Sequence, residues 1–258
     1  MFFVIFQHDT RRIFTGTRGK KSRFGHSFGG SAEYGGLRRF KEQPPAHLLC
    51  RLNMADPAVG ITLPEVQWLP LLCAIRYGAC DLSYQILSNG AVKILYQEES
   101  KAWDDFPYDG YPEQLPVEPM SLKMVKYDLD KPRDAYILAA AFGINLLTDT
   151  QFTGLACYVA KRKLYPNPEW SGFGWDSAED FLREEHGWWP FVQGPPPGDC
   201  LNRACSNRGR RGIMRTFAVF EEEEEKVRSL WGPHCDSLQI IYQICPECSA
   251  VRVNNQCT

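Results

Sequence analysis

The most constraining feature of this sequence is a Cys-x-x-Cys motif between two β-rich runs near its end. Residues 238–244 and 250–253 are rich in β-branched and aromatic side chains, and Cys245 and Cys248 lie between them. Two thiolates at one tight turn can bind a tetrahedral metal ion from two corners. The motif therefore predicts a hairpin whose turn forms half of a metal site, and it indicates no reaction.

A second cysteine pair, Cys200 and Cys205, follows a proline-rich connector at residues 194–198. Its four-residue spacer is looser than the usual two, but each pair precedes or divides strand-like sequence, as in a zinc ribbon. Soft thiolates bind zinc strongly, and the metal keeps them deprotonated near neutral pH. We therefore expect Cys200, Cys205, Cys245 and Cys248 to hold one structural Zn²⁺ ion.

Three further residues could replace a ligand of this set, namely His234, Cys235 and Cys257. The alternative that the four cysteines are buried thiols without a metal stays open. Cys73 and Cys157 lie within apolar stretches, and we expect both to be small core residues.

Charge divides the chain into a basic start and an acidic remainder. Residues 1–53 carry ten Lys and Arg against three Asp and Glu, whereas the whole chain has a formal net charge of −2. Glycines and basic residues interrupt any hydrophobic period in this first part. The sequence thus predicts a disordered basic N-terminal arm at residues 1–53 and a single domain at residues 54–258.

Local patterns within residues 54–258 predict both strands and helices. Asn89-Gly90 favours a tight hairpin turn between residues 84–87 and 92–96. Strands are expected at residues 122–129, 155–159 and 213–220, and helices at residues 132–147 and after Ser177, which can cap one. The predicted class is α+β, a mostly antiparallel sheet with a few helices and a zinc-ribbon-like hairpin pair at about residues 198–258.

Catalytic motifs are absent from the sequence. It contains no Gly-x-Ser-x-Gly, His-Glu-x-x-His or dinucleotide fingerprint. His234 and Cys235 are adjacent, and neighbours on a strand point to opposite faces, which argues against a cysteine–histidine dyad. A cysteine- or metal-dependent hydrolase is therefore an alternative and not the main hypothesis.

The composition also limits the kinds of partner that we expect the chain to bind. An acidic body is a poor nucleic-acid binder, so nucleic-acid binding through the basic arm is a second alternative. No apolar run approaches the roughly 20 residues of a membrane-spanning helix, and the six-residue apolar start is a poor secretory signal. We expect a cytoplasmic protein without a membrane partner.

From His186 onward, the chain carries a series of spaced features, namely Gly187, Pro190, Gln193, Met214, Trp231-Gly232, Gln243, Gln256 and the two cysteine pairs. Their order resembles the C-terminal part of the YwqG-like domains. The resemblance covers about 73 residues and departs at Trp188 and at Pro233-His234, and Gln193 comes one position early. It implies a mostly β, α+β domain that acts through protein contacts, with no catalytic residue to carry over. The main hypothesis is a non-catalytic, zinc-stapled binding or assembly module with an unknown protein partner.

Overall fold

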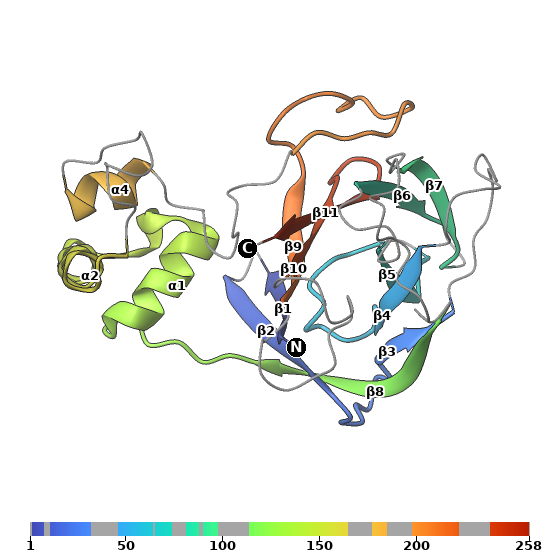
Figure 1. Cartoon of the computed structure of the whole chain (residues 1–258), viewed down its shortest axis with the longest axis horizontal. Coiled ribbons are helices and arrows are strands. Elements are labelled where there is room, and N and C mark those ends of the chain that lie inside the picture. The colour runs from blue at the N-terminus through green and yellow to red at the C-terminus, as the bar shows by residue number, and fades with distance from the viewer. Residues whose placement is uncertain are drawn as a thin grey trace. The chain divides into compact units, whose positions relative to one another are not determined.

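The strands of the described residues form one antiparallel sheet of eleven strands, in the order β5-β4-β3-β8-β2-β1-β9-β10-β11-β6-β7 (Figure 1). This computed structural model describes residues 2–7, 11–31, 46–63, 65–73, 81–87, 90–97, 114–164, 177–184, 198–221 and 238–257. The strands are β1 (Phe2–Gln7), β2 (Arg12–Arg18), β3 (Ser27–Gly30), β4 (His47–Asn53), β5 (Trp68–Cys73), β6 (Leu82–Ile86), β7 (Val92–Gln97), β8 (Leu115–Met124), β9 (Arg215–Glu221), β10 (Leu238–Ile244) and β11 (Ala250–Cys257).

The predicted α+β class is wrong, because strands dominate and the helices are few and short. The chain divides into two compact units, one of residues 1–124 with 196–258 and one of residues 125–195. The sheet belongs to the first unit, and the three α-helices of the described chain belong to the second. A single domain beginning at residue 54 was expected, so this division also differs from the prediction.

The sheet curls until it nearly closes on itself. Tyr84 of β6 is fully buried, and its hydroxyl donates a hydrogen bond to the Pro70 carbonyl of β5 at 2.8 Å. The same hydroxyl oxygen accepts one from the Leu72 N–H at 3.3 Å. One tyrosine therefore links β5, at one end of the strand order, to β6, the second strand from the other end, around an apolar core.

Residues 1–53 contribute four strands to this sheet, and this corrects the predicted disordered arm. β1 lies between β2 and β9 and pairs with both of them. Phe3, Val4, Ile5 and Phe6 are at most 4% exposed. Strands from distant parts of the chain cover these apolar side chains. A local hydrophobic period therefore does not reveal that they are buried.

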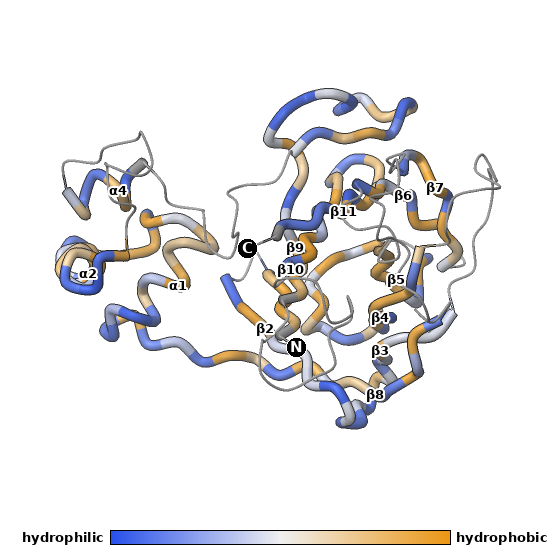
Figure 2. Tube along the Cα trace, viewed as in Figure 1, coloured by the Kyte–Doolittle hydropathy of each residue, from blue (hydrophilic) through white to orange (hydrophobic). Residues whose placement is uncertain are grey.

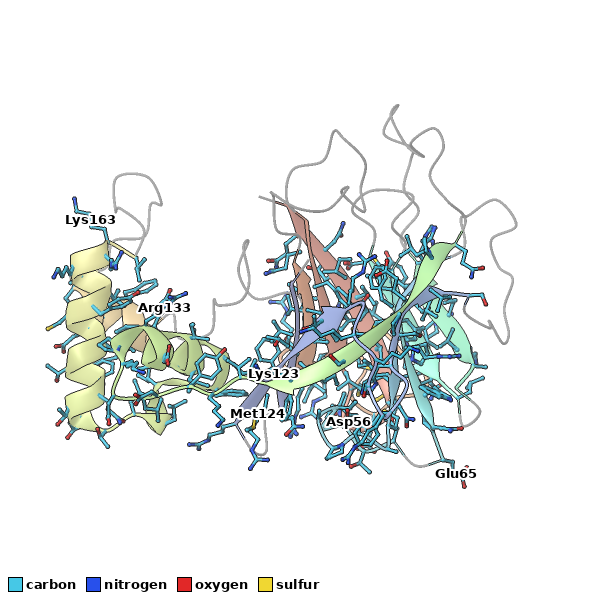
Figure 3. The ribbon with its side chains drawn as sticks, turned by 90° about the horizontal axis from the view of Figure 1, so that it is seen from below. Asp56, Glu65, Lys123, Met124, Arg133 and Lys163 are labelled. Atoms are coloured by element: carbon cyan, nitrogen blue, oxygen red, sulfur yellow. The ribbon has the colours of Figure 1, made fainter. Side chains whose placement is uncertain are left out.

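A buried polar contact crosses the expected domain boundary at residues 53 and 54. The Asn53 N–H donates to His26 Nδ1 at 3.0 Å, which leaves the ring proton on Nε2. His26 Nε2 in turn lies 2.7 Å from a carboxylate oxygen of Asp56, in the loop after β4 (Figure 3). Both side chains are satisfied inside the fold, so we assign them a structural role.

The second unit consists of α1 (Pro132–Phe142), the 3-10 helix η2 (Ile144–Leu146), α2 (Asp149–Arg162) and α4 (Ala178–Glu184). α1 begins with a proline in its first turn, as the sequence predicts. The predicted strand at residues 155–159 is wrong, because Thr148 and Gln151 form a capping box that starts α2. None of the helices in the described chain combines the length and apolar composition needed to cross a bilayer.

Candidate metal centre

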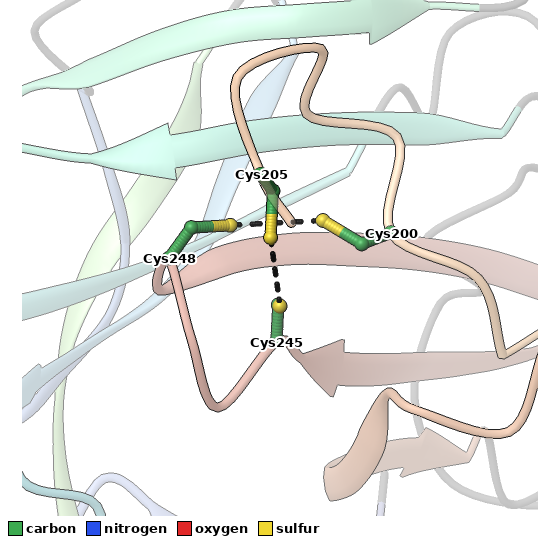
Figure 4. Close-up of side chains that lie close together, drawn as sticks. All are labelled: Cys200, Cys205, Cys245 and Cys248. Carbon is green, nitrogen blue, oxygen red and sulfur yellow. Dashed lines mark hydrogen bonds between the residues drawn. The ribbon is translucent and has the colours of Figure 1, made fainter. Parts of the chain in front are cut away.

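The four predicted cysteines lie together in one cluster (Figure 4). Cys200 Sγ is 3.6 Å from Cys248 Sγ, and Cys205 Sγ is 3.7 Å from Cys245 Sγ. All four sulfurs lie within 4.8 Å of one another. Four thiolates at about 2.3 Å from a tetrahedral zinc ion would be about 3.8 Å apart. The residues present therefore fit a tetrahedral metal ion.

The second cysteine pair is placed by the turn between β10 and β11, and the predicted hairpin is present. The Cys245 N–H donates to the Ala250 carbonyl at 2.8 Å, and the Ser249 N–H donates to the Cys245 carbonyl at 3.1 Å. Ser249 has a φ of 56°, a left-handed conformation that reverses the chain directly after Cys248. The turn holds the sulfurs of Cys245 and Cys248 against the loop that carries Cys200 and Cys205.

The first cysteine pair lies in a loop of successive turns before β9, so only the second pair has the expected hairpin. Cys200 forms an isolated bridge with Arg208, and the Gly209 N–H donates to the Cys200 carbonyl at 3.2 Å. Between the cysteines, the buried Asn202 accepts the Ala204 N–H on its side-chain oxygen at 3.1 Å. These bonds close the loop and bring Cys200 and Cys205 together despite their longer spacing.

The cluster is largely shielded from water. Cys200, Cys205 and Cys245 are at most 8% exposed, and they pack with Met214 and Ala250. Cys248 is half-buried. A tetrahedral ion held by four such thiolates would have no open position for water or substrate.

Thiol ionisation in this cluster depends on burial and on backbone donors. Burial raises the pKa of the Cys200 and Cys205 thiols. Burial opposes ionisation of Cys245 as well, but hydrogen bonds from the backbone N–H groups of Cys248 and Glu247, together with those from the Cys205 and Cys248 thiols, outweigh it and lower the pKa of Cys245. A divalent cation would favour the thiolate form of all four, because it places positive charge among the sulfurs.

Arg252 of β11 braces the cluster through two carboxylates that sequence reasoning missed. Its guanidinium forms ion pairs with Asp81, at 2.8 Å, and with Asp199, which directly precedes Cys200. The Arg252 side chain is only 8% exposed. The available sequence signal was an arginine between two valines in a β-rich run, since a buried charge needs a partner.

The structure does not describe the side chains of the three proposed substitute ligands. His234 and Cys235 lie outside the described residues, and Cys257 ends β11 with a side chain that the structure does not describe. Cys73 is buried, as predicted, but Cys157 is exposed on α2, so the core assignment of Cys157 is wrong.

Comparison of the chain with protein-family models, with curated proteins and with solved structures finds no match. The resemblance to the YwqG-like domains therefore stays a prediction, and the functional argument depends on the geometry of the cluster.

Proposed function

We propose that this chain is a non-catalytic binding or assembly module whose sheet is stapled by one Zn²⁺ ion on Cys200, Cys205, Cys245 and Cys248. The observation that carries the proposal is the set of four sulfurs within 4.8 Å of one another. Tetrahedral sites made only of thiolates are typical of zinc or of iron–sulfur centres, and in zinc sites of this type the ion is structural.

The position of the cluster explains what the staple would stabilise. The β10–β11 turn supplies two ligands, and the loop that enters β9 supplies the other two. Without a metal, a hydrogen bond and an ion pair between Asp199 and Arg252 attach this loop to β11. Because unfolded chains have no pre-formed site, the free energy of metal binding would add to the free energy of folding.

A hydrolase is disfavoured by the composition of the cluster. All four ligands are thiols and no carboxylate or imidazole completes the set among the described residues. A catalytic zinc site usually has three protein ligands and one exchangeable water.

Metal analysis of the purified full chain tests the proposal. We expect one zinc per chain by mass spectrometry of the elements, and Co²⁺ substitution should give the absorption bands of thiolate-to-metal charge transfer. Cys245→Ser should lose most of the metal and lower the unfolding midpoint. Cys157→Ser is the matched control, because this exposed thiol lies on α2 in the other unit.

A wild-type chain that is free of metal as purified, binds no zinc when it is added, and unfolds at the same midpoint in the presence of a chelator would contradict the proposal. Equal metal content in the Cys245→Ser and Cys157→Ser variants would contradict the assignment of the ligands.

A further inference from the structure

The loop that carries Cys200 and Cys205 is basic, although the whole chain has a negative formal charge. Residues 198–215, called the arginine loop below, contain five arginines and one aspartate, a formal charge of +4. Since the whole chain has a formal charge of −2, the remaining residues sum to −6. The loop is the orange segment above β9 in Figure 1, and Figure 2 shows it as mostly hydrophilic. Its arginines are Arg203, Arg208, Arg210, Arg211 and Arg215, and all are exposed.

The charges of the arginine loop are not neutralised by the part of the chain that the structure describes. None of the five arginines takes part in an ion pair there, and Arg210 only donates a hydrogen bond to Asn207 at 3.1 Å. The single aspartate, Asp199, is already paired with Arg252. Like charges held in one loop repel each other, and a bound anion would offset this repulsion. The surface therefore favours an anionic ligand.

A cavity of about 220 Å³, lined by polar and apolar atoms in similar proportion, adjoins this loop at Arg215. Pro246 of the cysteine turn also lines it, and among the residues that the structure describes Arg215 is the one charged residue of its wall. The cavity is smaller than the roughly 300–1,000 Å³ of typical small-molecule pockets, so it has room for about one large side chain. Its apolar lining comes from Phe6, Ile61, Leu63, Phe217 and Ile244.

We propose that the arginine loop and this cavity form one docking surface for an extended acidic segment of a partner protein. One large apolar side chain of that segment fills the cavity, and neighbouring carboxylates bind Arg215 and the other arginines. Guanidinium groups pair with carboxylates through two parallel hydrogen bonds, which favours arginine over lysine at such surfaces. The inference rests on the proposed metal staple, because Cys200 and Cys205 fix the conformation of the loop.

Two observations favour an acidic peptide of another chain over other anions. Residues 198–215 contain no aromatic side chain, whereas single-stranded nucleic acids are usually bound by arginines together with stacking aromatics. Glu221, the one residue of the chain's own glutamate run whose backbone the structure describes, lies at the opposite end of β9 from Arg215, about 20 Å away along the strand.

Fluorescence anisotropy with labelled probes tests the proposal on the zinc-loaded full chain. The probe is a short synthetic peptide of glutamates and aspartates with one central leucine. Its controls are the same peptide with serine in place of leucine, a lysine version of the same peptide, and a single-stranded oligonucleotide of similar charge. We expect the leucine peptide to bind, the serine version to bind about 10-fold more weakly, since burial of one such side chain contributes that much or more, and the lysine version not to bind.

Variants locate the binding surface. Arg215→Gln and Arg211→Gln should each weaken binding of the leucine peptide by about 3- to 30-fold, as expected for a lost charge-assisted hydrogen bond. Arg133→Gln is the matched control, because Arg133 is an exposed arginine at the start of α1 in the other unit (Figure 3). The zinc content and unfolding midpoint of the arginine variants should equal those of the wild type.

The outcomes separate this inference from the proposed function. A zinc-loaded chain that binds none of the peptides overturns the docking surface and leaves the staple intact. Binding that Cys245→Ser does not weaken overturns the dependence of the surface on the metal. Tighter binding of the oligonucleotide, lost in Arg215→Gln, overturns the acidic-peptide assignment in favour of nucleic acid.

Discussion

Removal of residues 1–53 should abolish folding of the sheet unit, although the sequence of this part predicts a dispensable arm. The deletion removes β1 to β4, and β1 is the strand that joins β2 to β9. Without β1 the sheet order is cut between β8 and β9, and β5 loses the strand with which it pairs.

The magnitude follows from the buried side chains of this part of the chain. Burial of one large apolar side chain stabilises a fold by about 1.5–3 kcal/mol. The nine such side chains of residues 1–53 thus correspond to roughly 14–27 kcal/mol, which exceeds the about 5–15 kcal/mol by which whole domains are stable. They are at most 4% exposed: Phe3, Val4, Ile5, Phe6, Ile13, Phe28, Leu48, Leu49 and Leu52.

Circular dichroism and urea unfolding of residues 54–258 beside the full chain check this prediction. The truncated protein should lack a cooperative transition for the sheet unit. In the full chain, Ile5→Ala should cost about 2–5 kcal/mol, whereas Thr17→Ala, at an exposed position of β2, should change stability by less than about 0.5 kcal/mol. A truncated protein with the strand content and midpoint of the full chain would refute the reasoning.

Three further predictions concern other parts of the molecule. A high-affinity chelator should remove the metal and lower the thermal unfolding midpoint of the wild type, and added zinc should restore it; an unchanged midpoint would contradict the staple. Burial raises the pKa of Cys50 and of Tyr242, so the unfolded chain releases these protons first as the pH rises. The unfolding free energy should therefore fall with rising pH by about 1.4 kcal/mol per pH unit for each group, from about pH 9 for Cys50 and from about pH 10 for Tyr242, in urea titrations at about pH 8 and about pH 11. Gly29→Ala should destabilise the sheet unit by about 1–3 kcal/mol or more, because Gly29 has a φ of +70° and a Cβ would overlap the Pro116 carbonyl. In contrast, Gly154→Ala should stabilise α2 by about 1 kcal/mol, because a Cβ there meets no atom, and thermal melts of the two variants should shift in opposite directions.

The candidate site could be predicted from the sequence because its chemistry is encoded locally. Cys245 and Cys248 sit at a turn between two β-rich runs, and a soft thiolate pair needs a second pair to complete a tetrahedron. Cys200 and Cys205 were the remaining pair with a suitable position. The bracing role of Arg252 could not be predicted, because Asp81 lies 171 residues away in the chain.

The fold class and the structure of the first 53 residues were predicted less well, because the partners of these strands lie far away in the sequence. β1 pairs with β9, so the side chains that cover Phe3 and Ile5 come from the far end of the sequence. Glycines and arginines in β2 and β3 interrupt the alternating pattern that marks a half-buried strand. The strand expected at residues 155–159 was overridden by the cap at Thr148, a local signal that a capping-box search would have found.

The pairing of β1 with β9 has a consequence for biosynthesis. Ile5 faces Ala218 in that pair, so the first strand must wait for about 210 residues to be translated before this neighbour exists. At about 5–20 residues per second, the wait is roughly 10–40 s. During that time the nascent segment FFVIFQ keeps one hydrogen-bonding edge open, and such apolar, uncharged strands readily associate with copies of themselves. Expression at low temperature or with co-produced chaperones should therefore raise the yield of folded protein, since protection is needed until the closing strands emerge from the ribosome.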